Sequence, residues 1–140
     1  MAEADPRLDE LADAFDLLGD WEERYRYVIE LGRGLEPLPD AARTEATRVS
    51  GCASQVWLLA RTNADGKMSW LGDSDAHIVR GLIAILLDLY SGRTPQEVLD
   101  FDAKGAIQRL GLSEALSSQR SNGLNAMIQR IRADAAQASR

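Results

Sequence analysis

The spacing of apolar residues changes along this 140-residue chain, and that change limits the folds open to it. Before residue 32 and after residue 77, apolar residues recur every three or four positions, which predicts amphipathic helices. From Thr44 to Leu71 the apolar and β-branched residues favour extended strands, and Asn63–Gly66 is a turn signal between two of them. Helices on both sides of a short run of strands, without βαβ alternation, predict an α+β fold with a small antiparallel meander.

Glycine, proline and capping residues set where the predicted helices begin and end. The helical stripes cover Leu8–Leu18, Trp21–Leu31, Ile78–Leu89, a short segment from Thr94–Pro95, Ala103–Leu110 and Leu124–Ala135. Asp73–Ser74 is expected to cap the third of these helices, and Gly92 is expected to end it. We expect the polar segment Ser117–Asn122 to be a junction before the last helix.

Length, charge and hydropathy narrow the class of protein. A chain of 140 residues has the usual size of one domain, so we expect residues 1–140 to form a single domain. The net charge of −6 and the lack of a dense basic block disfavour nucleic acid as a partner. No apolar run reaches the roughly 20 residues of a membrane span, and the acidic start does not resemble a signal peptide. We therefore expect a cytoplasmic protein that does not bind membranes.

Cys52 is the only cysteine, and His77 is the only histidine. An internal disulfide is therefore impossible, and these two residues cannot fill a four-ligand zinc site, so we expect no bound metal. Cys52 follows Gly51 at a predicted tight corner between strands, where a side chain can be presented at a loop tip. From its position alone, Cys52 fits equally well as a small buried apolar residue or as a reactive thiol.

Four segments of the chain, taken together, resemble the SufE/CsdE family of sulfur acceptors. They are Asp20–Tyr25, Val49–Trp57, Gly72–Leu82 and Arg120–Leu124, in that order and spacing. The resemblance implies that Cys52 accepts a persulfide sulfur from a cysteine desulfurase of the SufS/CsdA type, stimulates that enzyme, and passes the sulfur on for iron–sulfur cluster assembly.

The resemblance also carries expectations about the fold and the cofactor. It implies a three-stranded antiparallel sheet packed against several helices, similar to the U-type iron–sulfur scaffold proteins. Pyridoxal phosphate would belong to the partner desulfurase, and we expect this chain to bind no cofactor. The chain would then act as a sulfur-transfer partner, through Cys52, rather than as an independent enzyme.

Arg120, Asp75 and His77 are the candidates for tuning the thiol or docking the partner. Helix capping and surface ion pairing explain these three residues equally well. Two other functions also fit: an adaptor that stimulates a desulfurase without carrying sulfur, and a redox-sensing cysteine protein. The lack of a second, resolving cysteine disfavours the sensor. If Cys52 is reactive, we expect its apolar neighbours Val49, Val56 and Trp57 to shelter it until a partner docks.

Overall fold

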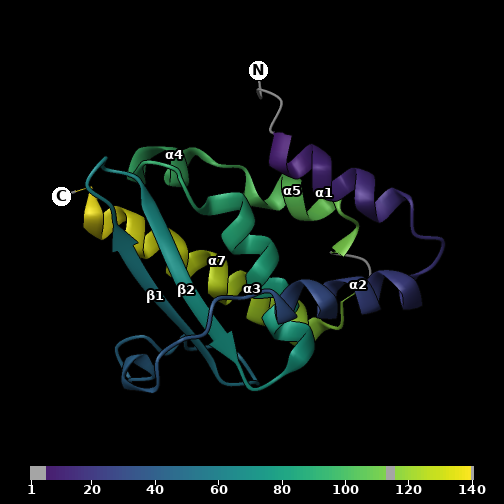
Figure 1. The fold of residues 1–140 in the computed structure, drawn as a ribbon, viewed down its shortest axis with the longest axis horizontal. Helices are drawn as coiled ribbons and strands as arrows, with labels where there is room; N and C mark the ends of the chain where they lie inside the picture. The colour runs from purple at the N-terminus through teal and green to yellow at the C-terminus, as the bar shows by residue number, and fades with distance from the viewer. Residues whose placement is uncertain (1–5, 113–115, 140) are drawn as a thin grey trace.

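The structure is a computed structural model that describes residues 6–112 and 116–139 (Figure 1). Its elements are α1 (Pro6–Asp16), α2 (Trp21–Arg33), a 3-10 turn (Asp40–Ala42), β1 (Val56–Thr62), β2 (Met68–Ser74), α3 (His77–Tyr90), α4 (Pro95–Asp100), α5 (Ala103–Arg109) and α7 (Ser118–Ala138). Helices thus flank one antiparallel pair of strands, which confirms the α+β class. None of the described helices combines the length and the apolar character that crossing a membrane requires.

The two strands form a hairpin whose register places Val56 opposite Ser74 and Thr62 opposite Met68. The predicted turn lies at its tip, where the amide of Gly66 donates to the carbonyl of Asn63 over 2.9 Å. Gly66 has φ +81°, a left-handed conformation that glycine adopts without strain. The alternating burial along β2 shows that one face of the hairpin packs on the core.

The expected third strand is wrong, because the segment before Cys52 pairs with β1 only at a single bridge between Arg48 and Trp57. Upstream of the bridge, the amide of Thr47 bonds back to the carbonyl of Thr44, which holds the chain in a turn. Downstream, Gly51 at φ +89° directs the chain away from the sheet. A turn on each side leaves too few extended residues for a strand.

Helix α3 is the centre of the fold and lies between the hairpin and α2 (Figure 1). One stripe of its side chains is almost fully buried: Leu82, Ile83, Ile85, Leu86 and Leu89. On the side facing α2, Gly81 lets the two helix backbones approach closely. A Cβ atom at Gly81 would lie only 2.1 Å from the carbonyl oxygen of Val28, so no larger residue fits there.

Two of the predicted helix starts need correction. Asp73 and Ser74 belong to the end of β2, and α3 begins after Ala76, which provides no side-chain cap. The carboxylate of Asp73 is occupied by ion pairs with Arg43 (2.6 Å) and Arg80 (3.0 Å). The predicted junction Ser117–Asn122 is helical from Ser118 onward, because the hydroxyl of Ser117 caps the helix and its first turn tolerates exposed polar residues.

Candidate functional site

Cys52 lies in the loop that connects the Arg48–Trp57 bridge to β1. Gly51 turns the chain just before it, and residues 53–55 lead into the strand. The loop is anchored at its far end, where the carboxylate of Asp75 accepts from the amide of Gln55 over 3.0 Å. The carbonyl of Gln55 accepts in turn from the amide of Asp75 over 3.3 Å. Cys52 is thus presented by a short loop that is fixed to the segment before α3.

The Cys52 side chain is half-buried and turns toward α7. Its Sγ lies 3.6 Å from the carbonyl oxygen of Gly123, a distance at which a protonated thiol donates a weak hydrogen bond. Beside it is a cavity of about 170 Å³, which we call the Cys52 cavity. The large apolar side chains in its wall come from two helices: Ile78, Val79 and Leu82 of α3, and Leu124 and Met127 of α7.

Burial raises the pKa of the Cys52 thiol above its ordinary value. The neutral thiol therefore predominates at neutral pH, and it is a much poorer nucleophile than the thiolate. The shelter expected for Cys52 is present, but the residues that provide it differ from those expected around its loop. Val49 and Val56 are buried in the core, Trp57 stacks against Arg43 with 5.0 Å between ring centroid and guanidinium, and none of the three lines the Cys52 cavity.

Arg120 is the candidate that the structure brings to Cys52. It projects from the first turn of α7, lines the Cys52 cavity, and places its guanidinium 5.5 Å from the ring centroid of Tyr25 in α2. Within the described part of the chain it forms no ion pair. A cation held beside a buried thiol by an aromatic ring can stabilise a negative sulfur.

Asp75 and His77 do not line the Cys52 cavity, although Ala76 between them does. Asp75 is exposed and anchors the loop through Gln55, so it positions the Cys52 loop without lining the cavity. His77 is the first residue of α3, and its side chain also lies outside the cavity wall. Of the three sequence candidates, Arg120 lines the cavity and Asp75 supports the Cys52 loop, whereas His77 does neither.

Gly123 is a site residue that the sequence reasoning missed. A Cβ atom at this position would lie in ordinary contact with Cys52, 3.7 Å from Sγ and 4.0 Å from Cβ, so its absence leaves open space beside the thiol. Glycine inside a helix costs about 1 kcal/mol relative to alanine, so its presence in α7 is a signal of a packing or functional reason. That signal was available in the sequence.

A charged cluster next to the site was also missed. Asp73 joins Arg43 in the loop before the bridge to Arg80 in α3, and Arg43 also approaches Asp40. Partial burial acts to raise the pKa of Asp73, but hydrogen bonds from Arg43 and the Ser74 amide and the charge of Arg80 lower it overall. The cluster fixes the loop preceding Cys52 against the core. No group of three or more potential metal ligands occurs within residues 6–112 and 116–139.

Comparison with known proteins shows the family to which the chain belongs. Residues 9–135 match the model of the SufE family, described as an Fe-S metabolism associated domain. The chain belongs to the SufE family. Two relatives of this SufE chain are each named an uncharacterized SufE-like protein. One, from Rhizobium etli, is 54% identical over 91% of the chain and 88% of its own length, and one from Rhizobium meliloti is 49% identical over 91% and 94%.

A solved structure supports the SufE fold described above. It is the solution structure of a hypothetical protein from Thermus thermophilus, with a TM-score of 0.78 and 25% sequence identity. The match covers 97% of this chain and 98% of that protein. The arrangement of helices around one small sheet is therefore shared along nearly the whole chain.

Proposed function

We propose that this SufE protein is a sulfur carrier that takes persulfide sulfur from a cysteine desulfurase onto Cys52, stimulates that enzyme, and passes the sulfur on for iron–sulfur cluster assembly. The observation that supports it most directly is the placement of the only thiol of the chain in the wall of a cavity. A buried structural cysteine would be enclosed by the core, whereas Cys52 adjoins space that a second sulfur atom can occupy.

The transfer step is a displacement at sulfur. The Cys52 thiolate attacks the outer sulfur of the desulfurase persulfide, a new S–S bond forms on Cys52, and the S–S bond of the donor breaks. The desulfurase cysteine leaves as a thiolate, and the proton lost by Cys52 goes to solvent or to that leaving thiolate. One S–S bond replaces another, so no external oxidant or reductant is required. Pyridoxal phosphate stays with the desulfurase throughout.

The site accounts for protection as well as transfer. In the free protein the neutral, half-buried thiol reacts slowly with small oxidants, because they too require the thiolate. Docking of the desulfurase would draw the Cys52 loop outward and let the thiol ionise, with Arg120 as the nearby cation. After transfer the persulfide would return to the Cys52 cavity, where the apolar walls from α3 and α7 exclude water.

A role as the cluster scaffold itself is disfavoured by ligand number. Iron–sulfur clusters are commonly held by four cysteine thiolates, and this chain supplies one. The similarity of the fold to U-type scaffolds remains a prediction from the family resemblance. The chain is better suited to deliver sulfur than to hold the finished cluster.

The deciding experiment is intact-mass analysis after incubation with a cysteine desulfurase and cysteine. A carrier gains the mass of one sulfur atom, reductant reverses the gain, and Cys52→Ser gains nothing. Ser54→Ala, which alters the same cavity but keeps the thiol, is the matched control and should still be labelled. If Cys52→Ser stimulates the desulfurase as fully as the native protein, the chain is a docking adaptor and the carrier proposal is wrong.

A further inference from the structure

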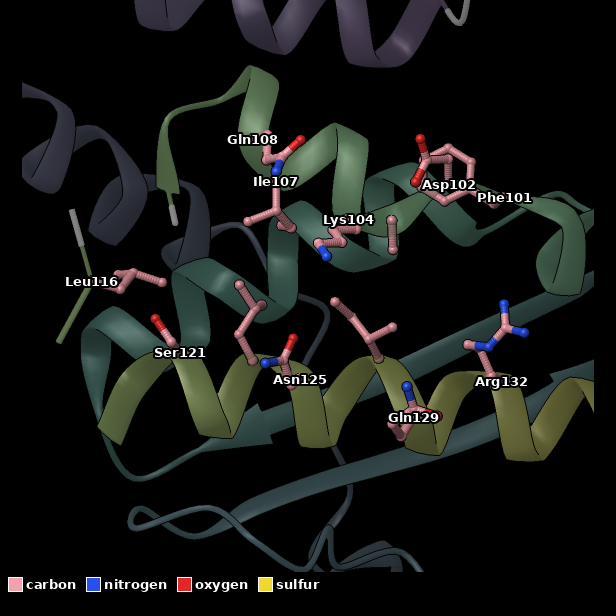
Figure 2. Close-up of a pocket in the computed structure, with 13 residues that line it drawn as sticks. Phe101, Asp102, Lys104, Ile107, Gln108, Leu116, Ser121, Asn125, Gln129 and Arg132 are labelled. Carbon is pink, nitrogen blue, oxygen red and sulfur yellow. The ribbon is translucent and has the colours of Figure 1, made fainter. Parts of the chain in front are cut away.

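A second cavity, of about 520 Å³, lies between α5 and α7 (Figure 2). We call it the α5–α7 groove. Its apolar lining consists of Phe101, Ala103, Ile107, Leu116, Leu124 and Ile128. The volume falls in the range of about 300–1,000 Å³ that is typical of small-molecule sites, and it is far too small to hold a protein domain.

The α5–α7 groove is elongated along α7. Its lining residues on that helix include Ser121, Asn125, Ile128 and Arg132, which recur every three or four positions and so form one stripe. From residue 121 to residue 132 this stripe spans roughly 16 Å at 1.5 Å per residue. The groove therefore suits an extended ligand better than a compact one.

Two cations face this apolar space from opposite sides. Figure 2 shows the amine of Lys104 between α5 and α7, and the guanidinium of Arg132 extending from α7 toward Phe101 and Asp102. Arg132 donates one hydrogen bond to the carbonyl of Leu99 over 2.8 Å, which orients the guanidinium and leaves its other N–H groups available.

The only acid among the described lining residues is already engaged. One carboxylate oxygen of Asp102 accepts from the amide of Gly105 over 3.0 Å, as the cap of α5. Lys104 has no hydrogen bond or ion pair with a described residue. Asp102 keeps its negative charge, so two cations and one carboxylate leave the described lining with a net charge of +1.

We propose that the α5–α7 groove binds an elongated amphiphile with a single anionic headgroup, of the class of medium-chain carboxylates. The apolar chain lies along the floor formed by Ile107, Leu124 and Ile128, and the carboxylate lies between Lys104 and Arg132. Arginine and lysine are the usual partners of carboxylates in proteins, and an apolar surround strengthens that attraction.

The groove is distinct from the sulfur site. Leu124 is the one residue that lines both cavities, and Cys52 lies on the other side of it. The proposed ligand site does not depend on Cys52 chemistry, so its test can fail or succeed whatever the outcome of the sulfur-transfer experiment.

The test is a titration of the full-length protein with octanoate, followed by two-dimensional 1H–15N NMR, which suits a chain of 15.4 kDa. We expect saturable shifts that concentrate in α5 and in α7 between residues 121 and 132. The neutral analogue octan-1-ol should bind at least fivefold more weakly. Shifts spread over unrelated surfaces, no saturable shifts, or equal affinity for octan-1-ol would each overturn the proposal.

Charge variants test where the headgroup lies. Lys104→Gln should weaken octanoate binding at least fivefold while leaving octan-1-ol binding unchanged, because it removes a charge and little apolar surface. The matched control is Lys67→Gln in the β1–β2 hairpin, since Lys67 is the only other lysine of the chain. Octanoate affinity that is equal in Lys104→Gln and Lys67→Gln would refute the proposed headgroup site.

Discussion

Replacing Gly123 by alanine should raise stability and lower sulfur transfer at the same time. Alanine is favoured over glycine inside a helix by about 1 kcal/mol. The added methyl group would lie 3.7 Å from the Cys52 Sγ, which is an ordinary van der Waals contact and creates no strain. We therefore expect the free energy of unfolding to rise by about 1 kcal/mol and the melting temperature by about 4 °C.

The same Gly123→Ala substitution should destabilise the protein when Cys52 carries a persulfide. An outer sulfur atom is attached about 2.05 Å from Sγ and needs about 3.5 Å of separation from a carbon atom. A methyl group 3.7 Å from Sγ removes much of that space on the α7 side of the Cys52 cavity. Overpacking by one such group costs about 1–3 kcal/mol, so transfer should fall about tenfold or more.

Thermal melting and the rate of mass gain with a persulfidated desulfurase measure the two effects of Gly123→Ala separately. Asn122→Ala is the control, because residue 122 is exposed on the same helix and lies outside the cavity wall. It should gain stability without losing transfer. If Gly123→Ala transfers sulfur at the native rate, the persulfide is not stored in the Cys52 cavity, and if it melts lower, the described packing of α7 is wrong.

Cys52, Arg120, Tyr90 and Gly81 offer further tests of the structure. Burial raises the pKa of Cys52, so alkylation of the protein by iodoacetamide should reach its half-maximal rate at a higher pH than alkylation of an unstructured cysteine peptide. A half-maximal pH equal to or below that of the peptide would contradict the raised pKa. Arg120→Ala should lower the rate of sulfur transfer strongly but the free energy of unfolding only by about 1 kcal/mol, which is the value of its contact with Tyr25. If the melting temperature falls enough to account for all of the lost transfer, Arg120 is a structural residue. Tyr90→Phe should raise the free energy of unfolding by about 1 kcal/mol, because the Tyr90 hydroxyl is buried without a hydrogen-bond partner among the described residues. Burial raises the pKa of Tyr90 to about 12, so the native protein should lose more stability than the variant between pH 10 and 12, where the unfolded chain gives up this proton first. Identical pH profiles for the two proteins would refute this. Gly81→Ala should lower the free energy of unfolding by about 3 kcal/mol in chemical denaturation, because its Cβ would overlap the carbonyl of Val28. A denaturation midpoint equal to that of the native protein would show that α2 and α3 are farther apart than described.

Local signals in the sequence were sufficient where neighbouring residues decide the structure. The capping box of Thr94 and Glu97 starts α4 as its residue pattern predicts, and Gly66 completes the hairpin turn. The helical stripe from Ile78 to Leu89 is the buried face of α3. In these cases the hydrogen bonds and the apolar spacing lie within a few residues of one another, so they could be predicted without knowledge of distant contacts.

The sequence also singled out Cys52, because it is the only thiol, but it could not say what surrounds that thiol. The cavity is closed by Gly123 of α7, 71 residues away along the chain, and by the apolar face of α3. Residues close in sequence, such as Val56, were expected to shelter Cys52, yet Val56 faces the core instead. Such neighbours are set by how helices pack, which depends on surfaces far apart in the chain.

The third strand and the charged cluster show the same limit. Residues 44–49 have the composition of a strand, but the Thr44–Thr47 turn and the left-handed Gly51 limit their pairing with β1 to the single Arg48–Trp57 bridge. Asp73 was expected to cap a helix, but Arg43 and Arg80 reach it from two other segments and engage its carboxylate. Sequence alone determined the class of the fold and the candidate reactive atom. Tertiary structure decided which groups face that atom, because strand pairing and ion pairing depend on partners that only folding brings together.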